Sequence, residues 1–295
     1  MSEGILNTEI ACCPACGPGA SNVWIAQKDS TRYNICSRCG TVFASPRASH
    51  ASRYAWLNDT FALDDARIQH INNRRHMLAL EAAMIDAYIQ GGTLLDVGCS
   101  TGAFFDYFDA ARWQKFGVEL SPSTAAYAAQ TYSAEVRAGT LQSAHFPAGA
   151  FDLITMIDMF YYEENPQDLL REAARIIRPE GWLVIELPGQ AFHRLRGRGL
   201  LCWLLDHQWS RFDSRSGYLY WYSPAGIDTL LNQAGFEVTQ WEVVGAPDRR
   251  GVSQRLAVAY FKLMRLLVKR FPRAISWAPK YFVLAKTRKT GAKIF

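Results

Sequence analysis

Apolar runs bounded by glycine and polar residues alternate, through the middle of the chain, with longer segments of helical periodicity. The run 94–97 leads into the small residues 98–102, a pattern that predicts a buried strand, a tight turn and the start of a helix. Further apolar runs at 115–119, 151–157 and 182–188 predict parallel strands that alternate with helices. This alternation predicts the α/β class with a doubly wound, Rossmann-like sheet.

The last part of the chain predicts a closing hairpin with a helix inserted in it. Segments 236–245 and 280–289 are expected to pair, which gives a seven-stranded sheet whose last strand is antiparallel. Between them, about residues 252–273, lies a basic amphipathic pattern with about 100° per residue. The cations that share one side of this helix are Arg255, Lys262, Arg265, Lys269, Arg270 and Arg273. The apolar residues expected on the opposite side are Leu256, Tyr260, Phe261, Leu263, Met264, Leu267 and Phe271.

Two interpretations of this helix stay open. It could lie on an anionic membrane surface, as basic amphipathic helices do, or pack on the sheet with a solvated basic face. The segments expected along the whole chain are a zinc ribbon at 1–48, a helical linker or cap at 49–90, a ligand-binding core at 91–190, an inserted substrate lid at 191–223 and the C-terminal part of the core at 224–295. The inserted segment is rich in Trp, Tyr and Arg, and a packed helical cap is the alternative to a lid.

The composition narrows the class of protein and its expected location. With 49% apolar and 20% charged residues the chain is of ordinary globular type. The first ten residues contain an acid and no apolar core, so no signal peptide is expected. The expected location is the cytoplasm, with peripheral contact to the cytoplasmic membrane face as an open addition.

The net charge of +5 hides an asymmetry. Residues 249–295 contain 13 Lys and Arg and no acid, which leaves 19 basic and 27 acidic residues in the first 248. A basic tail on an acidic body predicts an anionic partner for the tail. Docking of the tail on the acidic body is the plainer alternative.

Two Cys-x-x-Cys-Gly sequences near the N-terminus predict a metal site. They place Cys13 and Cys16 in one tight turn and Cys36 and Cys39 in another, with 19 residues between the pairs. Four thiolates close a tetrahedral site, which favours a structural Zn²⁺ and leaves no position for a catalytic water. A redox dithiol would need only one such pair.

The glycine turn after the strand 94–97 suits a nucleoside better than a dinucleotide. A Gly-x-Gly-x-x-Gly template counted from Gly98 meets Ser100 and Ala103 where glycines are needed, and no Gly-Lys-Ser/Thr follows. Glu119 ends the next strand, 23 residues after Asp96, where an acid accepts hydrogen bonds from ribose hydroxyls. The ligand is expected over the carboxyl ends of the strands.

Four consecutive stretches resemble the ordered motifs of class I S-adenosylmethionine (SAM)-dependent methyltransferases. These are LLDVGCSTGAF, GVELSP, AGTLQSAHFPAGAFDLITMIDM and AARIIRPEGWLVIELP, which together span about residues 94–188. The cysteine pairs followed by CGTVFASPRA resemble a bacterial subgroup with an N-terminal zinc ribbon that includes sugar C-methyltransferases and other glycan-modifying enzymes. The resemblance implies methyl transfer to a nucleotide-linked sugar or lipid-linked glycan, with polysaccharide biosynthesis as the setting.

The resemblance also implies which residues hold SAM. Asp96, Gly98, Ser100 and Gly102 would line the methionine and sulfonium part, with Ser100 in place of a commoner glycine. Glu119 would hold the ribose and Leu120 would lie against adenine. Thr140 and Leu141 would meet the adenine edge, and Met156 and Ile157 would form the pocket floor.

The catalytic base is less defined. Relatives often carry a histidine where this chain has Tyr162, and another where it has Tyr218. Both tyrosines are candidates for the chemistry or for packing, and His207 is a further candidate.

Two other functions compete with this one. An RNA methyltransferase would use the ribbon and the basic tail, but the ribbon lacks clustered cations and stacking aromatics, so a nucleic acid is not the expected partner. A SAM-binding scaffold without chemistry would explain the two tyrosines.

Overall fold

The structure is a computed structural model of the 295-residue chain. It describes residues 8–20, 22–28, 31–49, 57, 63–196, 218–244 and 252–288. His207 and most of the segment predicted as a lid lie outside the described residues.

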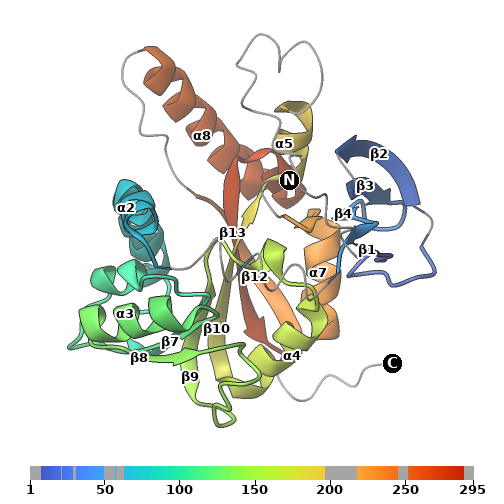
Figure 1. The fold of residues 1–295 in the computed structure, drawn as a ribbon. Coiled ribbons are helices and arrows are strands. Elements are labelled where there is room, and N and C mark those ends of the chain that lie inside the picture. Colours follow the sequence, from blue (N-terminus) through green and yellow to red (C-terminus); the bar gives the residue numbers. More distant parts are fainter. Residues whose placement is uncertain are drawn as a thin grey trace.

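A seven-stranded sheet forms the centre of the molecule, in the order β12-β13-β10-β9-β6-β7-β8 (Figure 1). Its strands are β6 (Gly92–Val97), β7 (Trp113–Glu119), β8 (Glu135–Ala138), β9 (Phe151–Met156), β10 (Ile177–Pro188), β12 (Phe236–Val243) and β13 (Lys280–Thr287). Five neighbouring strands from β10 to β8 are parallel, and β13 is antiparallel to both of its neighbours. The predicted fold class is confirmed.

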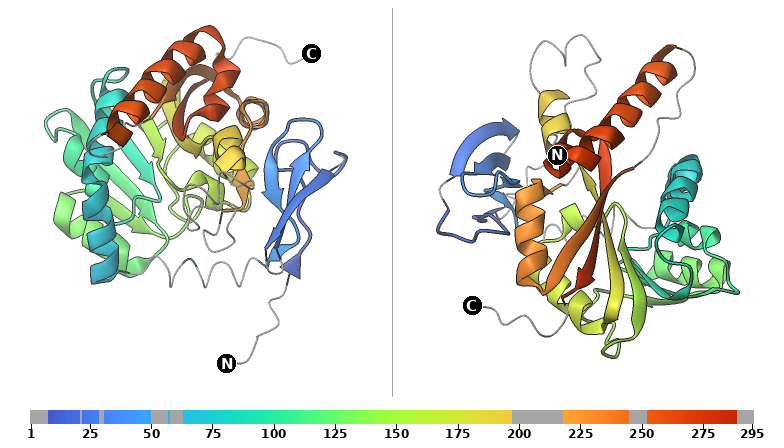
Figure 2. Two further views of the ribbon diagram at one scale, coloured as in Figure 1. Left: turned by 90° about the horizontal axis from the view of Figure 1, so that it is seen from above. Right: turned by 180° about the vertical axis from the view of Figure 1, so that it is seen from behind.

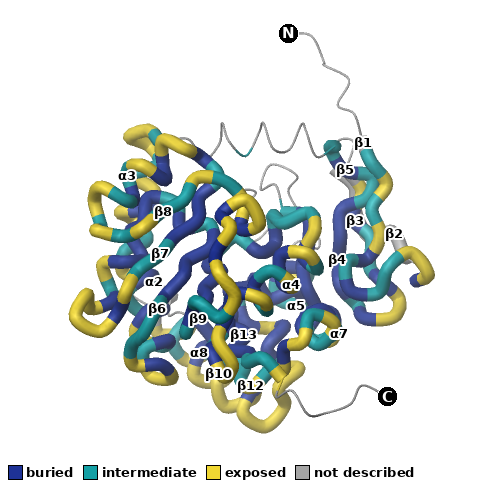
Figure 3. Tube along the Cα trace, turned by 90° about the horizontal axis from the view of Figure 1, so that it is seen from below, coloured by how far each residue is buried: buried dark blue, intermediate teal, exposed yellow. Residues whose placement is uncertain are grey.

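Helices cover both faces of this sheet (Figures 1 and 2). They are α2 (Asp65–Asp86), α3 (Pro122–Tyr132), α4 (Pro166–Ile176), α5 (Gln190–Arg196), α7 (Pro224–Gln233) and α8 (Val252–Arg270). Leu94 of β6 packs in the core beneath α2, whereas Leu95 packs in the core that includes α4 and α7. Strands buried on both faces are rich in apolar residues, and Figure 3 shows these central strands as buried.

The N-terminal ribbon is a second sheet, built from β2 (Asn22–Lys28), β3 (Thr31–Cys36), β4 (Val42–Ala44) and β11 (Tyr220–Trp221). Strand β11 comes from the end of the segment predicted as a lid, and it pairs antiparallel with β4. This end of the segment therefore completes the ribbon sheet. Its backbone groups find partners on β4, and Trp221 is fully buried against the ribbon, with its ring 5.4 Å from that of Tyr33.

Side chains of the central domain hold the cysteine turns in place. The amide of Gln190 donates to the carbonyl of Gly40 at 2.7 Å, and that of Gln233 donates to the carbonyl of Ala15 at 3.1 Å. The hydroxyl of Ser223 donates to the carbonyl of Cys39. The ribbon is thus fixed to the helix-covered core and to the residues that follow β11.

Helix α8 lies between β12 and β13, as predicted, and extends from the sheet beside α5 and α2 (Figures 1 and 2). Its predicted apolar side packs only in part. Phe261, Met264 and Val268 are buried, whereas Leu256, Leu263, Leu267 and Phe271 are exposed. The helix projects beyond the sheet edge, so only one narrow side meets the protein. None of the described helices is long and apolar enough to cross a membrane.

Candidate functional site

A cavity of about 640 Å³ opens over the carboxyl ends of β6, β7, β8 and β9. This volume falls in the range of small-molecule and cofactor sites. Eight of the ten residues predicted to hold SAM line it, namely Asp96, Gly98, Ser100, Glu119, Leu120, Thr140, Leu141 and Ile157. The parallel topology brings these residues together from four separate strand ends.

The glycine turn brings backbone close to the cavity. Gly98 has a φ of 72°, and a Cβ there would lie 3.0 Å from the Cβ of Met159. Ser100 has a φ of 52°, a left-handed conformation that also turns its backbone N–H toward Glu119. At both positions the backbone itself forms the cavity wall, so a small ligand can come close to its polar groups.

Glu119 is held in one orientation by backbone donors. Its carboxylate accepts from the N–H of Ser100 at 2.9 Å and from the N–H of Ser121 at 3.0 Å. Burial raises the pKa of Glu119, and these hydrogen bonds and the charge of Arg67 counter that shift. Each carboxylate oxygen retains a lone pair, so the group can accept two further hydrogen bonds from a diol.

Asp96 lies deeper in the same wall. It is buried, and the hydroxyl of Thr155 on β9 donates to it at 2.7 Å. Burial raises the pKa of Asp96 to about 7, although the Thr155 hydrogen bond acts in the opposite direction. A carboxylate in such a place gains from a positively charged ligand, because the cation offsets the cost of its burial.

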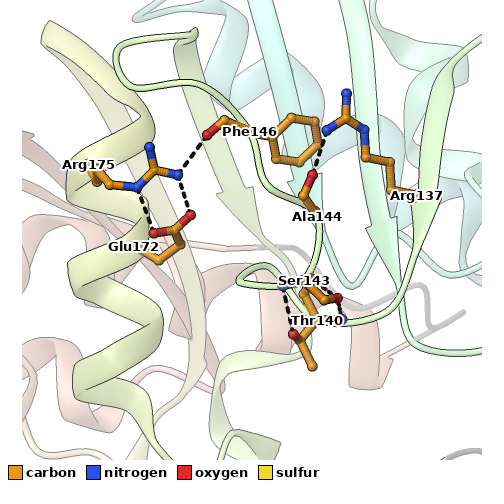
Figure 4. A network of polar contacts seen from close by, with 7 residues as sticks. All are labelled: Arg137, Thr140, Ser143, Ala144, Phe146, Glu172 and Arg175. Atoms are coloured by element: carbon orange, nitrogen blue, oxygen red, sulfur yellow. Dashed lines mark hydrogen bonds and ion pairs between the residues drawn. The ribbon is translucent and has the colours of Figure 1, made fainter.

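The loop after β8 supplies Thr140 and Leu141, and a polar network fixes its shape (Figure 4). The hydroxyl of Ser143 and the backbone of Thr140 exchange hydrogen bonds, while Arg137 donates to the carbonyl of Ala144 at 2.5 Å. Arg175 of α4 donates to the carbonyl of Phe146 at 2.7 Å. These hydrogen bonds therefore fix the position of the loop residues that line the cavity.

Gly102 and Met156, which the resemblance also assigns to SAM, do not line the cavity. Gly102 has a φ of 77°, and a Cβ there would lie 2.8 Å from the ring of Tyr132 and 3.0 Å from the Cβ of Ala128. Its role in the structure is to let the turn pack against α3. Met156 is fully buried within the sheet, where the alternation of β9 points it away from the site.

Helix α2 contributes cavity residues that the sequence analysis did not identify. Arg67, His70 and Arg74 all line the cavity, and Arg67 donates to the hydroxyl of Ser100 at 2.7 Å. Burial and the neighbouring charges of Arg74 and Arg67 lower the pKa of His70. In the sequence these three residues have the spacing i, i+3, i+7, which places their polar side chains on one side of a helix. This spacing could have indicated that they act together.

Three tyrosines form an aromatic part of the cavity wall. Tyr161, Tyr162 and Tyr218 all line it. The ring of Tyr161 lies 4.8 Å from that of Tyr162 and 4.0 Å from that of Tyr218. The two tyrosines predicted from the sequence are thus brought together, with a third between them, as an aromatic wall.

A buried ion network supports this wall. Asp158 accepts from the hydroxyl of Tyr161 at 2.6 Å and lies 2.5 Å from Arg74 and 2.7 Å from Lys280. Burial would raise the pKa of Asp158, but the charges of Lys280 and Arg74 outweigh it and hold the pKa below its usual range. Asp158 is therefore an anchor for two cations, and it is a weak base.

Two further carboxyl groups lie behind this network. Glu186 of β10 is fully buried and lies 2.9 Å from the ammonium of Lys280. Glu81 of α2 is also fully buried, and neither of its oxygens has a hydrogen-bond partner among the described residues. Burial and the charge of Glu186 raise the pKa of Glu81 to about 9, so it is a neutral acid at pH 7.

The four predicted metal ligands come together in the ribbon. The sulfurs of Cys13, Cys16, Cys36 and Cys39 all lie within 4.8 Å of one another. A tetrahedral Zn²⁺ with sulfur ligands needs sulfurs about 3.8 Å apart. The hydrogen bond from Cys13 lowers the pKa of Cys39 to about 5, which favours a thiolate. The donor set fits zinc.

Comparison with known proteins places the chain in a family. A family model described as "Methyltransferase domain" matches residues 68–241. Two curated proteins named "Ubiquinone biosynthesis O-methyltransferase" are similar to the chain. The one from Albidiferax ferrireducens is 30% identical over 32% of this chain and 40% of its own length. The one from Bordetella avium is 27% identical over 50% of this chain and 64% of its own length.

The chain therefore spans less than two thirds of the length of either curated relative. Among solved structures, a chain from the complex between the Haloferax volcanii Trm112 methyltransferase activator and a methyltransferase superimposes with a TM-score of 0.54. It is 18% identical, over 80% of this chain and 97% of that one, which is a likeness of fold. Since the family match covers more than half of the sequence and includes most of the cavity-lining residues, the protein belongs to the methyltransferase domain family.

Proposed function

We propose that the protein transfers the methyl group of SAM to a hydroxyl of a small, ring-shaped acceptor. The observation that carries this proposal is the buried carboxylate of Glu119, oriented by two backbone N–H groups beside the glycine turn and facing an open cavity. A carboxylate in this position accepts hydrogen bonds from a ribose diol.

The residues around Glu119 suit the rest of the SAM molecule. Asp96 and the turn at Gly98 would face its positively charged methionine end, and Leu120 and Leu141 would enclose the adenine. When bound, SAM supplies an activated methyl group. The main contribution of the protein is then orientation, which can supply about 7–11 kcal/mol.

The aromatic wall supports an acceptor with a flat or sugar-like ring. Tyr162 and Tyr218 could stack on such a ring and direct one of its hydroxyls toward the glycine turn. Tyr161 is unsuited to act as a base, because its hydroxyl donates to Asp158 and burial raises its pKa well above the ordinary value. His70 is a new candidate base, since its lowered pKa keeps the imidazole neutral at pH 7.

Two acceptor classes follow from different observations. The zinc-ribbon resemblance favours a nucleotide-linked sugar or a lipid-linked glycan. The curated relatives, which are named as O-methyltransferases of ubiquinone biosynthesis, favour a hydroxyl on an aromatic ring. A structural Zn²⁺ in the cysteine cluster is part of either proposal, and four reduced cysteines suit the cytoplasm.

Calorimetry with SAM and the variant Glu119→Gln tests the cofactor site. The amide replaces one of the two carboxylate oxygens with an NH2 group, which cannot accept from a backbone N–H of Ser100 or Ser121 or from a ribose hydroxyl, so we expect Kd to rise about 10- to 100-fold. Glu135→Gln, an exposed change on the neighbouring strand β8, is the matched control and should bind as the wild type does. Equal SAM affinity in all three proteins would remove the basis of the proposal.

A labelled-methyl assay then identifies the acceptor. Pools of sugar nucleotides, lipid extract and RNA are offered separately to the full chain with Tyr218→Phe as a comparison. We expect label in the sugar-nucleotide or lipid pool and a higher acceptor KM in the variant, since the phenol hydroxyl orients the ring. Label in RNA alone would favour the nucleic-acid alternative, and tight SAM binding without transfer to any pool would favour a scaffold.

A further inference from the structure

Exposed apolar side chains are concentrated on one projecting part of the molecule. Nine large hydrophobic residues are exposed among those that the structure describes, and six of them lie between residues 256 and 277. They are Leu256, Leu263, Leu266, Leu267, Phe271 and Trp277, and the exposed fraction reaches 68% at Leu256 and Leu266. Isolated exposed leucines are ordinary on a protein surface, whereas a group on one helix marks an interaction site.

Helix α8 divides into three stripes when its residues are placed about 100° apart. The first stripe packs on the protein and consists of Phe261, Met264 and Val268. The second is apolar and exposed, and consists of Leu256, Leu263 and Leu267, with the exposed Phe271 directly after the last residue of the helix. The third is basic and consists of Arg255, Lys262, Arg265, Lys269 and Arg270, with the exposed Leu266 among them. The exposed apolar stripe lies between the buried stripe and the basic stripe.

The cations of the third stripe are available to a partner. None of them forms an ion pair with a described residue, and the chain has no acid anywhere from 249 to 295. The other exposed arginines on the helices differ. Arg171 and Arg175, for example, each pair with an acid three residues away on α4.

Elsewhere in the basic tail, Lys280 pairs with Asp158 and Glu186. Lys286 lies 3.7 Å from Glu180, so that part of the tail does dock on acids of the body. The cations of α8 make no such contact with the described residues.

We propose that the exposed apolar and basic stripes of α8, called here the α8 surface, bind an anionic lipid bilayer. Lipid phosphates would meet the cations, while the leucines and Phe271 would enter the boundary with the acyl chains. A nucleic acid would use the cations and leave the leucines in water. A protein partner would need a face that is both acidic and apolar to match the two stripes. An anionic bilayer can bind the cations and bury the apolar side chains at the same time.

The position of this surface links it to the cavity. The hydroxyl of Tyr260 on α8 donates to the carbonyl of Trp277 at 2.6 Å, which ties the helix to the short turn η5 (Pro272–Trp277). Strand β13 begins three residues later at Lys280, whose ammonium lines the cavity. The α8 surface thus lies at the same sheet edge as the cavity. This inference does not depend on the proposed acceptor, but it would bring the cavity near lipid-borne molecules.

Sedimentation of the full chain with vesicles tests the proposal. The probes are phosphatidylcholine vesicles with and without phosphatidylglycerol, at low and at physiological salt. We expect the chain to sediment with the anionic vesicles only, and less at higher salt. The charge variant Lys262→Glu, Arg265→Glu and Lys269→Glu should lower the partition coefficient more than 100-fold, since each cation near such a surface contributes about fivefold.

Two further variants separate the stripes from general charge effects. Leu263→Ser with Leu267→Ser keeps every charge and should also lower vesicle binding, because these side chains are exposed and should not affect folding. Arg112→Glu, Arg171→Glu and Arg178→Glu alter exposed arginines elsewhere, make the same change in net charge and should leave vesicle binding intact. SAM affinity and melting temperature check the fold of each variant, since no residue of α8 lines the cavity.

Three results would overturn the proposal. The first is that wild-type chain ignores anionic vesicles, and the second is that the Arg112 control loses binding as fully as the α8 charge variant does. The third is that the leucine variant turns a dimer into a monomer or lowers the melting temperature, because the apolar stripe would then be covered by a second copy or by another segment of this chain. Binding to the wild type and the control, lost in both α8 variants, would establish it.

Discussion

Buried carboxyl groups in this protein are of two kinds. At Asp158 neighbouring cations outweigh burial and lower the pKa, whereas at Glu119 backbone donors counter part of the rise in pKa that burial causes. Glu81 and Glu186 lie behind the aromatic wall, and burial raises the pKa of both, with the charge of Glu186 adding to the rise at Glu81. The first kind faces the cavity and serves binding, while the second kind sets how the fold responds to pH.

Glu81→Gln should remove part of that response. The pKa of Glu81 rises from its ordinary value of 4.5 to about 9 in the fold, so the stability that this group contributes is complete below pH 4.5 and is lost as pH rises toward 9. Glutamine has the shape of the neutral acid and does not ionise. We expect the variant to be more stable than the wild type at pH 9, on the order of 2 kcal/mol, and similar at pH 5.

Urea unfolding at pH 5, 7 and 9 measures this difference. The matched control is Glu237→Gln, an exposed change on β12, whose stability should follow the wild type at every pH. A variant with the same pH dependence as the wild type would show that Glu81 is ionised in the fold. A uniform loss of stability at all pH values would instead show that the carboxyl group has a partner.

Among the secondary-structure elements, β11 is the one that connects the ribbon to the cavity. It pairs with β4 of the ribbon through Tyr220 and Trp221, and Tyr218 of the aromatic wall comes just before it. Arg47 of the ribbon donates to the hydroxyl of Tyr220 at 2.8 Å. The metal site therefore has a structural path, through β11, to the aromatic wall of the cavity.

Cys36→Ser should affect methyl transfer more strongly than SAM binding. With three thiolates left, we expect the zinc content to fall and the free energy of unfolding to drop by at least about 3 kcal/mol, because structural zinc contributes folding energy directly. SAM binding should persist, while methyl transfer should weaken as Tyr218 loses its support. Metal analysis, denaturant unfolding and calorimetry measure these effects.

Cys12→Ser is the control for this experiment. Cys12 is exposed and lies next to the cluster without belonging to it. The Cys12→Ser variant should retain the zinc content, the stability and the methyl-transfer activity of the wild type. If Cys36→Ser also kept its metal, or if SAM binding and methyl transfer fell together, β11 would not be the link between the ribbon and the aromatic wall.

At the scale of the whole molecule, the cavity belongs to both sides of the fold. Its walls come from β6 and β7, from α2 on one face of the sheet and from Tyr218 beside the ribbon. A ligand that touches all of them stabilises the folded chain as a whole. The charge asymmetry acts on the same scale, since the basic C-terminal part and the acidic remainder carry opposite net charge.

Saturating SAM should therefore raise the melting temperature. At about 100 times Kd, a ligand that binds only the folded state adds about 2.7 kcal/mol to its stability. For a chain of this size we expect a rise of several degrees in a thermal scan. At the same SAM concentration Glu119→Gln should show a smaller rise. An equal rise in both proteins would mean that the ligand is held without this carboxylate.

Much of the fold and of the cofactor end could be predicted because local signals encode them. The apolar run before Gly98, the acid at the end of the strand at 119 and the cysteine spacing each depend on residues close together in the sequence. Parallel strands then bring their carboxyl ends to one edge, so residues from β6, β7 and β8 had to meet. The cavity at this edge, with Asp96 and Glu119 in its wall, follows from that rule.

The sequence by itself thus determined the sheet, the cysteine cluster and the part of the cavity wall that the strand ends supply. The tertiary structure alone decided that Gly102 packs against α3, that Arg67 and Arg74 of α2 enter the cavity, and that β11 joins the ribbon. It also decided which half of the apolar side of α8 is buried. These outcomes depend on which surfaces meet across long sequence separations, and a periodic pattern shows that a residue prefers burial without showing what will cover it.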